Sequence, residues 1–193
     1  MKTVVIATGN SHKVEEFRQI LEPAGIRVLA ASDCGGMPEV EEDGQTFREN
    51  AAKKALATAR ALQQTVLADD SGLEVAALGG APGVHSARYA GEGGNDGRNL
   101  AKLLRNLEGI EDRRARFVCV LAVASPSGEV QFAEGEVCGR IAWQAQGQGG
   151  FGYDPAFIPE GYEQTFGQLP QEVKNSLSHR GRAIRQALEA GII

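Results

Sequence analysis

The chain of 193 residues contains only three cysteines, two methionines and one tryptophan. Cys34, Cys119 and Cys138 are odd in number and widely spaced, and no C-x-x-C pair occurs, which disfavours a disulfide framework and a cysteine zinc site. Positive charge is not in excess, since 20 Lys and Arg against 25 Asp and Glu give a net charge of −5. Nucleic-acid-binding proteins normally carry a basic excess, so we expect no nucleic-acid partner.

Long hydrophobic runs are also missing. The apolar run near the first residue is too short for a signal peptide, and no run reaches the length of a transmembrane helix. We therefore expect no membrane partner and a reducing cytoplasmic location. The length of 193 residues is ample for a hydrophobic core, and it predicts either one large domain, residues 1–193, or two intimately packed lobes within it.

The P-loop pattern G-x-x-x-x-G-K-[ST] is absent, but another strand-to-helix junction is present. Residues 3–8 are β-branched and apolar, which predicts a buried strand, and residues 12–21 have helical apolar spacing. The junction holds four residues that suit a phosphate group, through helix N–H groups and a lysine: Thr8, Gly9, Asn10 and Lys13. Ordinary capping of the helix by Asn10 is the competing interpretation.

The stretch VLADDSG, residues 66–72, carries two adjacent carboxylates. Its first three residues predict a buried strand that a turn at Ser71 interrupts. Neighbouring side chains of a strand point to opposite sides, so Asp69 and Asp70 should face different ways. A carboxylate at the end of such a strand is a natural oxygen ligand for Mg²⁺, although turn formation alone also explains the residues.

An acidic segment, residues 39–43, precedes a helix predicted over residues 47–62. Thr46 and Glu49 have the spacing of a capping box at its start. Lys54 lies in the first turns, where the helix dipole disfavours a cation, so we expect an anion nearby. A solvated loop is the simpler interpretation of the acidic segment.

The second half predicts a β-hairpin with strands over residues 115–125 and 129–143, followed near the C-terminus by two helices. Lys174 falls on the first of these helices, and His179 and Arg180 begin the second. The helix dipole disfavours cations at a helix start, so these groups fit best beside a base carbonyl or a phosphate. Surface positions are the alternative.

The segment GQGGFG, residues 147–152, matches the dinucleotide fingerprint G-x-G-x-x-G by letter. A true fingerprint follows a strand and opens a helix, whereas Asp154 and a proline follow here. We therefore interpret the match as coincidental. In a loop, Phe151 or Tyr153 offers a stacking surface and Asp154 an acceptor. Packing of the aromatic rings in the core is the alternative.

Together these features supply phosphate ligands, carboxylates for a divalent cation and a stacking group, which a nucleoside triphosphate with Mg²⁺ requires. No pairing of a Ser or Cys nucleophile with His stands out, so metal-assisted attack by water is the simplest mechanism.

Six segments, in order over nearly the full length, carry a resemblance to a known family: residues 7–13 (ATGNSHK), 46–51 (TFRENA), 68–73 (ADDSGL), 79–89 (GGAPGVHSARY), 149–155 (GGFGYDP) and 178–181 (SHRG). The chain resembles the inosine/xanthosine triphosphate pyrophosphatases. The resemblance implies hydrolysis of ITP, dITP and XTP to the monophosphate and pyrophosphate, with Mg²⁺, in a homodimer. It also implies a two-lobed α/β fold, in which helices flank a long twisted mixed sheet and the nucleotide occupies a cleft between the lobes.

The resemblance implies a role for individual residues. Asp70 should accept a proton from water and contact the metal, together with Glu41, or with Glu42 if the register of that loop differs. The residues implied at the phosphates are Thr8, Gly9, Asn10, Lys13 and Ser71, and Lys54 is a further phosphate ligand expected from its place on the predicted helix. The residues implied at the base and sugar are Phe151, Gly152, Tyr153, Asp154, Lys174, His179 and Arg180.

Selection against ATP and GTP needs a site that rewards a six-position carbonyl and leaves an amino group poorly paired. We expect Arg180 or Lys174 to donate a hydrogen bond to that carbonyl. Three alternatives stay open: a pyrophosphatase of modified pyrimidine nucleotides, a nucleotide sensor without catalysis, and a redox enzyme that binds NAD through residues 147–152.

Overall fold

The computed structural model describes residues 2–193 and contains, within that range, a six-stranded sheet in the order β2-β1-β3-β4-β5-β6. The strands are β1 (Lys2–Ile6), β2 (Ile26–Ala30), β3 (Val66–Val75), β4 (Arg114–Ala124), β5 (Val130–Ile141) and β6 (Phe157–Pro159). β1 pairs in parallel with both β2 and β3, whereas β5 and β6 are antiparallel, so the sheet is mixed, as predicted.

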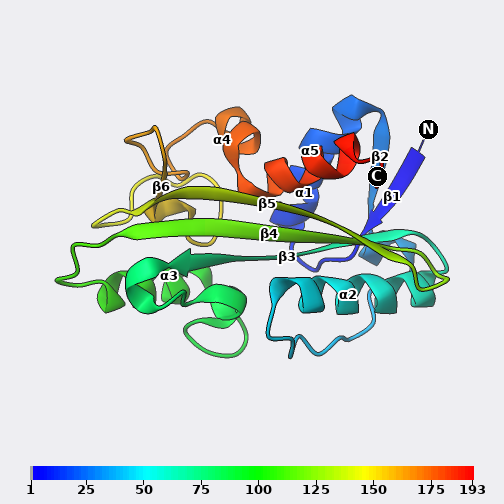
Figure 1. Cartoon of the computed structure of the whole chain (residues 1–193), viewed down its shortest axis with the longest axis horizontal. Helices are drawn as coiled ribbons and strands as arrows, with labels where there is room; N and C mark the ends of the chain where they lie inside the picture. Colours follow the sequence, from blue (N-terminus) through cyan, green and yellow to red (C-terminus); the bar gives the residue numbers. More distant parts are fainter. Residues whose placement is uncertain (1) are drawn as a thin grey trace. The chain divides into compact units, whose positions relative to one another are not determined.

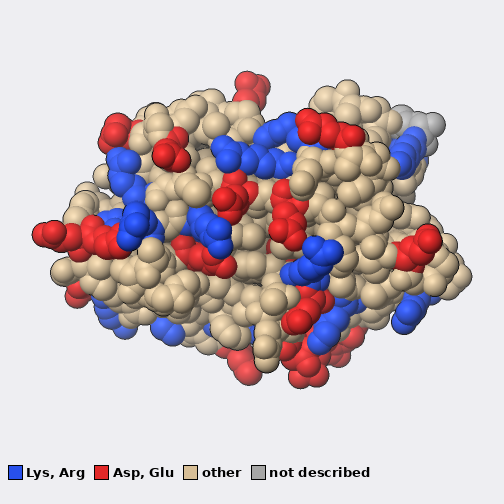
Figure 2. All heavy atoms as spheres, in the orientation of Figure 1, with Lys and Arg blue, Asp and Glu red and all other residues tan. Residues whose placement is uncertain are grey.

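The α-helices of the same range are α1 (Ser11–Leu21), α2 (Phe47–Leu62), α3 (Asp96–Asn106), α4 (Gln171–Leu177) and α5 (His179–Glu189). The helix predicted over residues 47–62 has the expected bounds, and Thr46 and Glu49 form the predicted capping box. None of these helices combines the length and the apolar character needed to cross a membrane. Figure 2 shows acidic and basic side chains mixed over the face that it presents.

The chain divides into two compact units, each with its own hydrophobic core. The first unit comprises the segments up to Asp70, Cys119–Gly135 and Arg180–Ile193. The second comprises Ser71–Val118 and Glu136–His179. β3, β4 and β5 each contribute residues to both units, so the sheet strands form part of both cores.

In the first unit, α1 and α5 lie on one side of the strands and α2 lies on the other (Figure 1). This arrangement explains why β1 has an uninterrupted apolar run, because a strand covered on both faces needs no polar alternation. Phe17 of α1, Leu67 of β3 and Ile184 of α5 are fully buried in the core of this unit. The core therefore fixes both helices against the carboxylate-bearing strand.

The turn predicted at Ser71 is wrong, because β3 continues without interruption from Val66 to Val75. The two residues after Asp70 have strong turn propensity, but β4 lies beside this strand in the sheet, and the N–H of Leu73 donates to Ser86 Oγ (2.9 Å). Sheet pairing and burial override local propensity here. The carboxylates thus lie in the middle of a strand rather than at its end.

In the second unit, the core contains a cluster of phenylalanine rings in contact with one another. The ring centroids of Phe117 and Phe157 are 4.6 Å apart, and those of Phe157 and Phe166 are 5.3 Å apart. The buried guanidinium of Arg113 donates to the carbonyl oxygens of Leu107 and of two residues at the end of β5, which ties the end of α3 to the sheet.

The segment of residues 147–152 is a loop, as predicted, and does not open a helix. A short 3₁₀ turn, Asp154–Ala156, and then β6 follow it. The loop therefore lacks the strand-to-helix setting of a dinucleotide fingerprint.

Gly139 on β5 lies where β5 and β6 approach each other closely. A Cβ atom at this position would overlap the carbonyl oxygen of Ile158 and the ring of Phe157. We expect Gly139→Ala to lower the free energy of unfolding by about 1–3 kcal/mol, measured by urea denaturation. Gly97→Ala in α3 is the matched control, since its Cβ has room, and it should be neutral or stabilise by up to about 1 kcal/mol. Equal changes in the free energy of unfolding for Gly139→Ala and Gly97→Ala would contradict the close packing of β5 against β6.

Candidate active site

The junction between β1 and α1 is organised by the side chain of Asn10. Its Oδ1 atom accepts hydrogen bonds from the backbone N–H groups of His12 (2.9 Å) and Lys13 (3.4 Å). The backbone N–H of Asn10 donates to Thr8 Oγ1 (3.1 Å). The capping predicted for Asn10 is therefore confirmed. Gly9 has no atom within 4 Å of a Cβ built on it, so the backbone there is open to approach.

Asp69 and Asp70 point to opposite faces of β3, as the alternation of a strand requires. Asp69 Oδ2 lies 3.0 Å from Lys13 Nζ on α1 and 3.0 Å from Arg180 Nη2 on α5. Asp70 Oδ1 lies 3.4 Å from Lys54 Nζ on α2, which covers the other face (Figure 1). Each carboxylate therefore has its own cations from its own helices.

Lys54 joins three acceptors around Asp70. Its Nζ donates to the backbone carbonyl of Asp69 (2.8 Å) and lies 3.3 Å from a carboxylate oxygen of Glu42. Burial by itself lowers the pKa of Lys54, but the carboxylates of Asp70, Asp69 and Glu42 outweigh burial and raise that pKa. The ammonium is therefore charged at neutral pH, and we expect it to attract a further anion to this face of β3.

Burial raises the pKa of Asp70 above its ordinary value of 3.8, although Lys54 and Lys13 oppose the shift. A carboxylate with a raised pKa is a stronger base than an exposed aspartate. Its second oxygen, Oδ2, is buried and has no hydrogen-bond partner among residues 2–193. A buried carboxylate oxygen without a partner is an available ligand or proton acceptor.

The donor set fits a divalent cation that takes most of its ligands from elsewhere. No group of three or more His, Cys, Asp and Glu side chains in the described chain could hold a metal ion alone. Mg²⁺ uses one or two protein carboxylates and fills its shell with water and phosphate oxygens, so Asp70 Oδ2 suits it. The ion pair with Lys54 brings Glu42 to the Asp70 side. Asp43 and Glu41 instead act on Lys53: both raise its pKa, Asp43 more strongly.

A second cluster, in the second unit, is centred on Asp154. Lys174 Nζ lies 2.6 Å from Asp154 Oδ2, and both side chains are at most 5% exposed. The same oxygen accepts from the backbone N–H of Phe151 (2.9 Å), whose ring centroid lies 4.8 Å from Lys174 Nζ. A Cβ on Gly150, which has φ +69°, would overlap the Asp154 carboxylate. Asp154 therefore sets the shape of the loop and holds the lysine beneath an aromatic ring.

The other predicted base and sugar residues of this unit have structural partners. The Tyr153 hydroxyl donates to the carbonyl of Ser86 (2.6 Å), and burial raises its pKa. The Gly152 N–H donates to Asp96 Oδ2 (3.0 Å). The His179 ring is stacked on Phe117, with centroids 4.8 Å apart. Core packing, the alternative considered for the aromatic residues, thus describes Tyr153 well.

The predicted residues are divided between the two units. The set in the first unit is Thr8, Gly9, Asn10, Lys13, Glu41, Lys54, Asp70 and Arg180. The set in the second unit is Ser71, Phe151, Gly152, Tyr153, Asp154, Lys174 and His179. Sequence reasoning gave no role to Glu16 or to the Asp96–Gly152 contact. The sequence signal for Glu16 was that this acid lies about one helical turn from Lys13 and next to the apolar Phe17. No local signal predicts the contact of Asp96 with Gly152.

Replacing Asp70 by Asn removes an acid whose pKa burial raises. Such an acid stabilises the folded state below its unfolded pKa, and the contribution is lost as the pH rises through the folded pKa. The free energy of unfolding of Asp70→Asn, relative to the parent chain, should therefore rise with pH from about pH 4 and then level off. Denaturant titrations at a series of pH values measure it.

Asp43→Asn is the control of opposite sign, because the hydrogen bond from Lys53 lowers the pKa of Asp43. Its unfolding free energy relative to the parent chain should fall as the pH rises. If the unfolding free energy of Asp70→Asn relative to the parent chain fell as the pH rose, burial would not raise the pKa of Asp70.

The chain is similar to known proteins over nearly its full length. The Ham1 family model matches residues 4–190. A protein of Desulforamulus reducens named dITP/XTP pyrophosphatase is 53% identical over 188 residues, which cover 96% of this chain and 94% of that protein.

Solved structures give the same result. The Staphylococcus aureus Ham1 protein is 45% identical, with a TM-score of 0.86 over 100% of both chains. A HAM1 protein from Coxiella burnetii is 38% identical, with a TM-score of 0.88 over 98% of both chains. The predicted fold class, a mixed sheet flanked by helices, and the family resemblance are both confirmed. This chain belongs to the Ham1 family.

Proposed function

We propose that this chain hydrolyses non-standard purine nucleoside triphosphates, namely dITP, ITP and XTP, to the nucleoside monophosphate and pyrophosphate. Relatives that match over nearly their whole length are named for this activity on dITP and XTP. The observation that carries the chemistry is Asp70, a buried carboxylate of raised pKa with one oxygen left without a hydrogen-bond partner and a lysine beside the other.

A divalent cation, for which we propose Mg²⁺, would be held by Asp70 and by one acid of the 39–43 segment. The ion pair of Glu42 with Lys54 favours Glu42 over Glu41, the residue preferred from sequence. When bound, the cation supplies charge neutralisation at phosphate oxygens.

The residues of the first unit carry the chemical step. Water attacks the α-phosphorus, the bond from phosphorus to the bridging oxygen breaks, and pyrophosphate leaves. Asp70 takes the proton of the attacking water as general base. Lys13 and Lys54 neutralise negative charge on the phosphate chain, and the open backbone at Gly9 lets phosphate oxygens approach the start of α1.

The residues of the second unit bind the base and sugar. Phe151 offers its ring for stacking, and Lys174, held by Asp154, donates to the six-position carbonyl. Of the two candidate donors, Lys174 is favoured over Arg180, because the Arg180 guanidinium faces Glu16 and Asp69. An adenine amino group in the same place would put its own N–H donors opposite the donors of the lysine, with no acceptor between them.

We also propose that the chain acts as a homodimer in the cytoplasm. The dimer follows from the family resemblance, and the location follows from the family's role in nucleotide metabolism and from the three cysteines, which form no disulfide in the described chain.

Asp70→Asn should lower kcat for dITP by about 10²–10⁴-fold, because the general base is lost while the fold is kept. A coupled assay for pyrophosphate, with chromatography of the nucleotide product, measures this. The parent chain should release pyrophosphate and dIMP. Release of orthophosphate, or binding of dITP without turnover by the parent chain, would refute the proposed function; near-normal turnover by the variant would refute the base.

Lys174→Met should reduce the ratio of kcat/KM for ITP to that for ATP by about 10-fold or more, because a donor to the carbonyl is lost. Lys102→Met is the matched control. Lys102 donates to the carbonyl of Tyr89 and its Nζ lies 4.4 Å from that ring's centroid, yet it lies outside the proposed site. An unchanged ratio for Lys174→Met, or an equal change for Lys102→Met, would contradict the assignment.

A further inference from the structure

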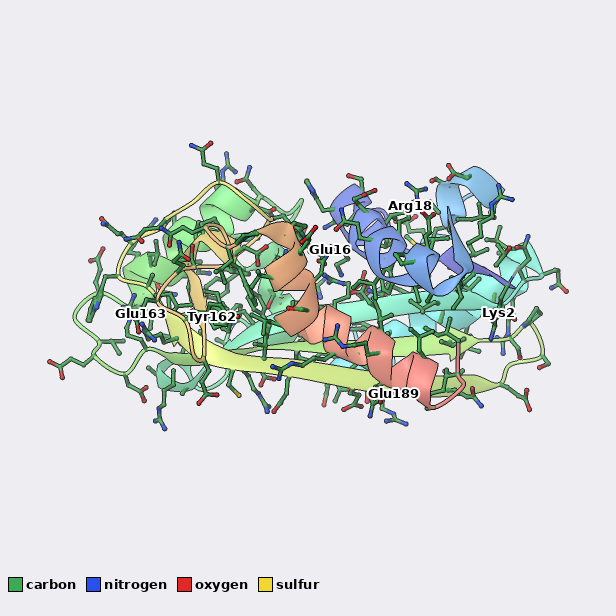
Figure 3. The ribbon with its side chains drawn as sticks, turned by 90° about the horizontal axis from the view of Figure 1, so that it is seen from above. Lys2, Glu16, Arg18, Tyr162, Glu163 and Glu189 are labelled. Carbon is green, nitrogen blue, oxygen red and sulfur yellow. The ribbon has the colours of Figure 1, made fainter. Side chains whose placement is uncertain are left out.

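Glu16 is a buried carboxylate on α1 for which the mechanism above has no role. Its side chain is 6% exposed and forms an ion pair with Nη1 of Arg180, whose side chain is 2% exposed. Figure 3 labels Glu16 and views the side of the sheet on which α1 and α5 lie. A buried acid at a core position requires a cation, and α5 supplies it.

The Arg180 guanidinium is shared between two carboxylates. Nη1 binds Glu16, and Nη2 binds Asp69 Oδ2 at 3.0 Å. A guanidinium prefers to bind one carboxylate with two parallel N–H groups. Glu16 binds Nη1, and the Asp69 oxygen that binds Nη2 also lies 3.0 Å from Lys13 Nζ. Glu16 therefore determines how Asp69 is divided between the two cations.

The same contacts reach the catalytic strand. Asp69 precedes Asp70 on β3, and its carbonyl accepts from Lys54 Nζ (2.8 Å). Two carboxylates and two cations, Glu16 and Asp69 with Arg180 and Lys13, balance their charges on one face of the strand. Loss of the charge on Glu16 leaves Arg180 to compete with Lys13 for Asp69.

We propose that Glu16 is a positioning residue which, through Arg180 and Asp69, holds the Lys13 ammonium in place for the phosphate chain of the substrate. The inference rests on the proposed function and adds a residue to it. A purely structural acid would stabilise the core without affecting how Lys13 acts. The two roles differ in whether the effects of Glu16 and Lys13 on the reaction are coupled.

The test is a double-mutant cycle on dITP hydrolysis with Glu16→Gln and Lys13→Met. Glu16→Gln keeps the shape of the side chain and should lower kcat/KM by about 10–100-fold, since small displacements of a binding group have effects of this size. On the Lys13→Met background it should change kcat/KM by less than about 3-fold, because the group it positions is gone. The proposal would be overturned if the losses in kcat/KM of the two single variants multiplied in the double variant. It would also be overturned if Glu16→Gln alone left kcat/KM unchanged.

Controls separate positioning from stability. Glu15→Gln removes an exposed carboxylate that binds Gln19 (3.1 Å) on the same helix, and it should leave kcat/KM unchanged. Glu16→Asp keeps the charge at shorter reach, so it should show a smaller loss than Glu16→Gln and the same coupling to Lys13. This second variant keeps the test decisive if Glu16→Gln does not fold.

Binding of inorganic triphosphate, measured by calorimetry, separates this inference from the proposed function. Glu16→Gln should weaken binding when Lys13 is present and leave it unchanged in the Lys13→Met chain. A parent chain that binds triphosphate with this coupling but does not hydrolyse dITP would refute the function alone. A hydrolase without the coupling would refute the positioning role alone.

Discussion

The structure depends on the burial of two adjacent carboxylates on one strand. Because β3 is extended, Asp69 and Asp70 face opposite sides, and because helices cover both sides, both acids are buried. A buried charge is tolerated only with a partner, so each acid requires cations from the helices on its own side. α1 and α5 supply Lys13 and Arg180 to one, and α2 supplies Lys54 to the other.

The two acids differ in how completely they are neutralised. Asp69 lies between two cations at 3.0 Å, so it acts as a fixed anion that orients them. Asp70 has a lysine 3.4 Å from one carboxylate oxygen, a longer contact than either of the two at Asp69. Neighbouring residues of the same type thus receive different roles from their surroundings, one structural and one reactive.

Much of this arrangement could be predicted from the sequence where local signals sufficed. The Asn10 cap, the capping box of α2 and the rejection of the 147–152 fingerprint depend on a few consecutive residues. The continuation of β3 through Ser71 could not be predicted, because its sheet partners are distant in sequence. Nor could the contact of Glu16 with Arg180, which are 164 positions apart, or that of Asp96 with Gly152.

The titration of the Asp70 carboxyl carbon by NMR tests the central claim most directly, with the assignment made by comparison with Asp70→Asn. Burial that outweighs the lysines predicts a pKa above the ordinary value of 3.8. Replacing Lys54 by Met should raise the pKa further, because the nearest cation is removed. A pKa at or below the ordinary value in the parent chain would contradict the account.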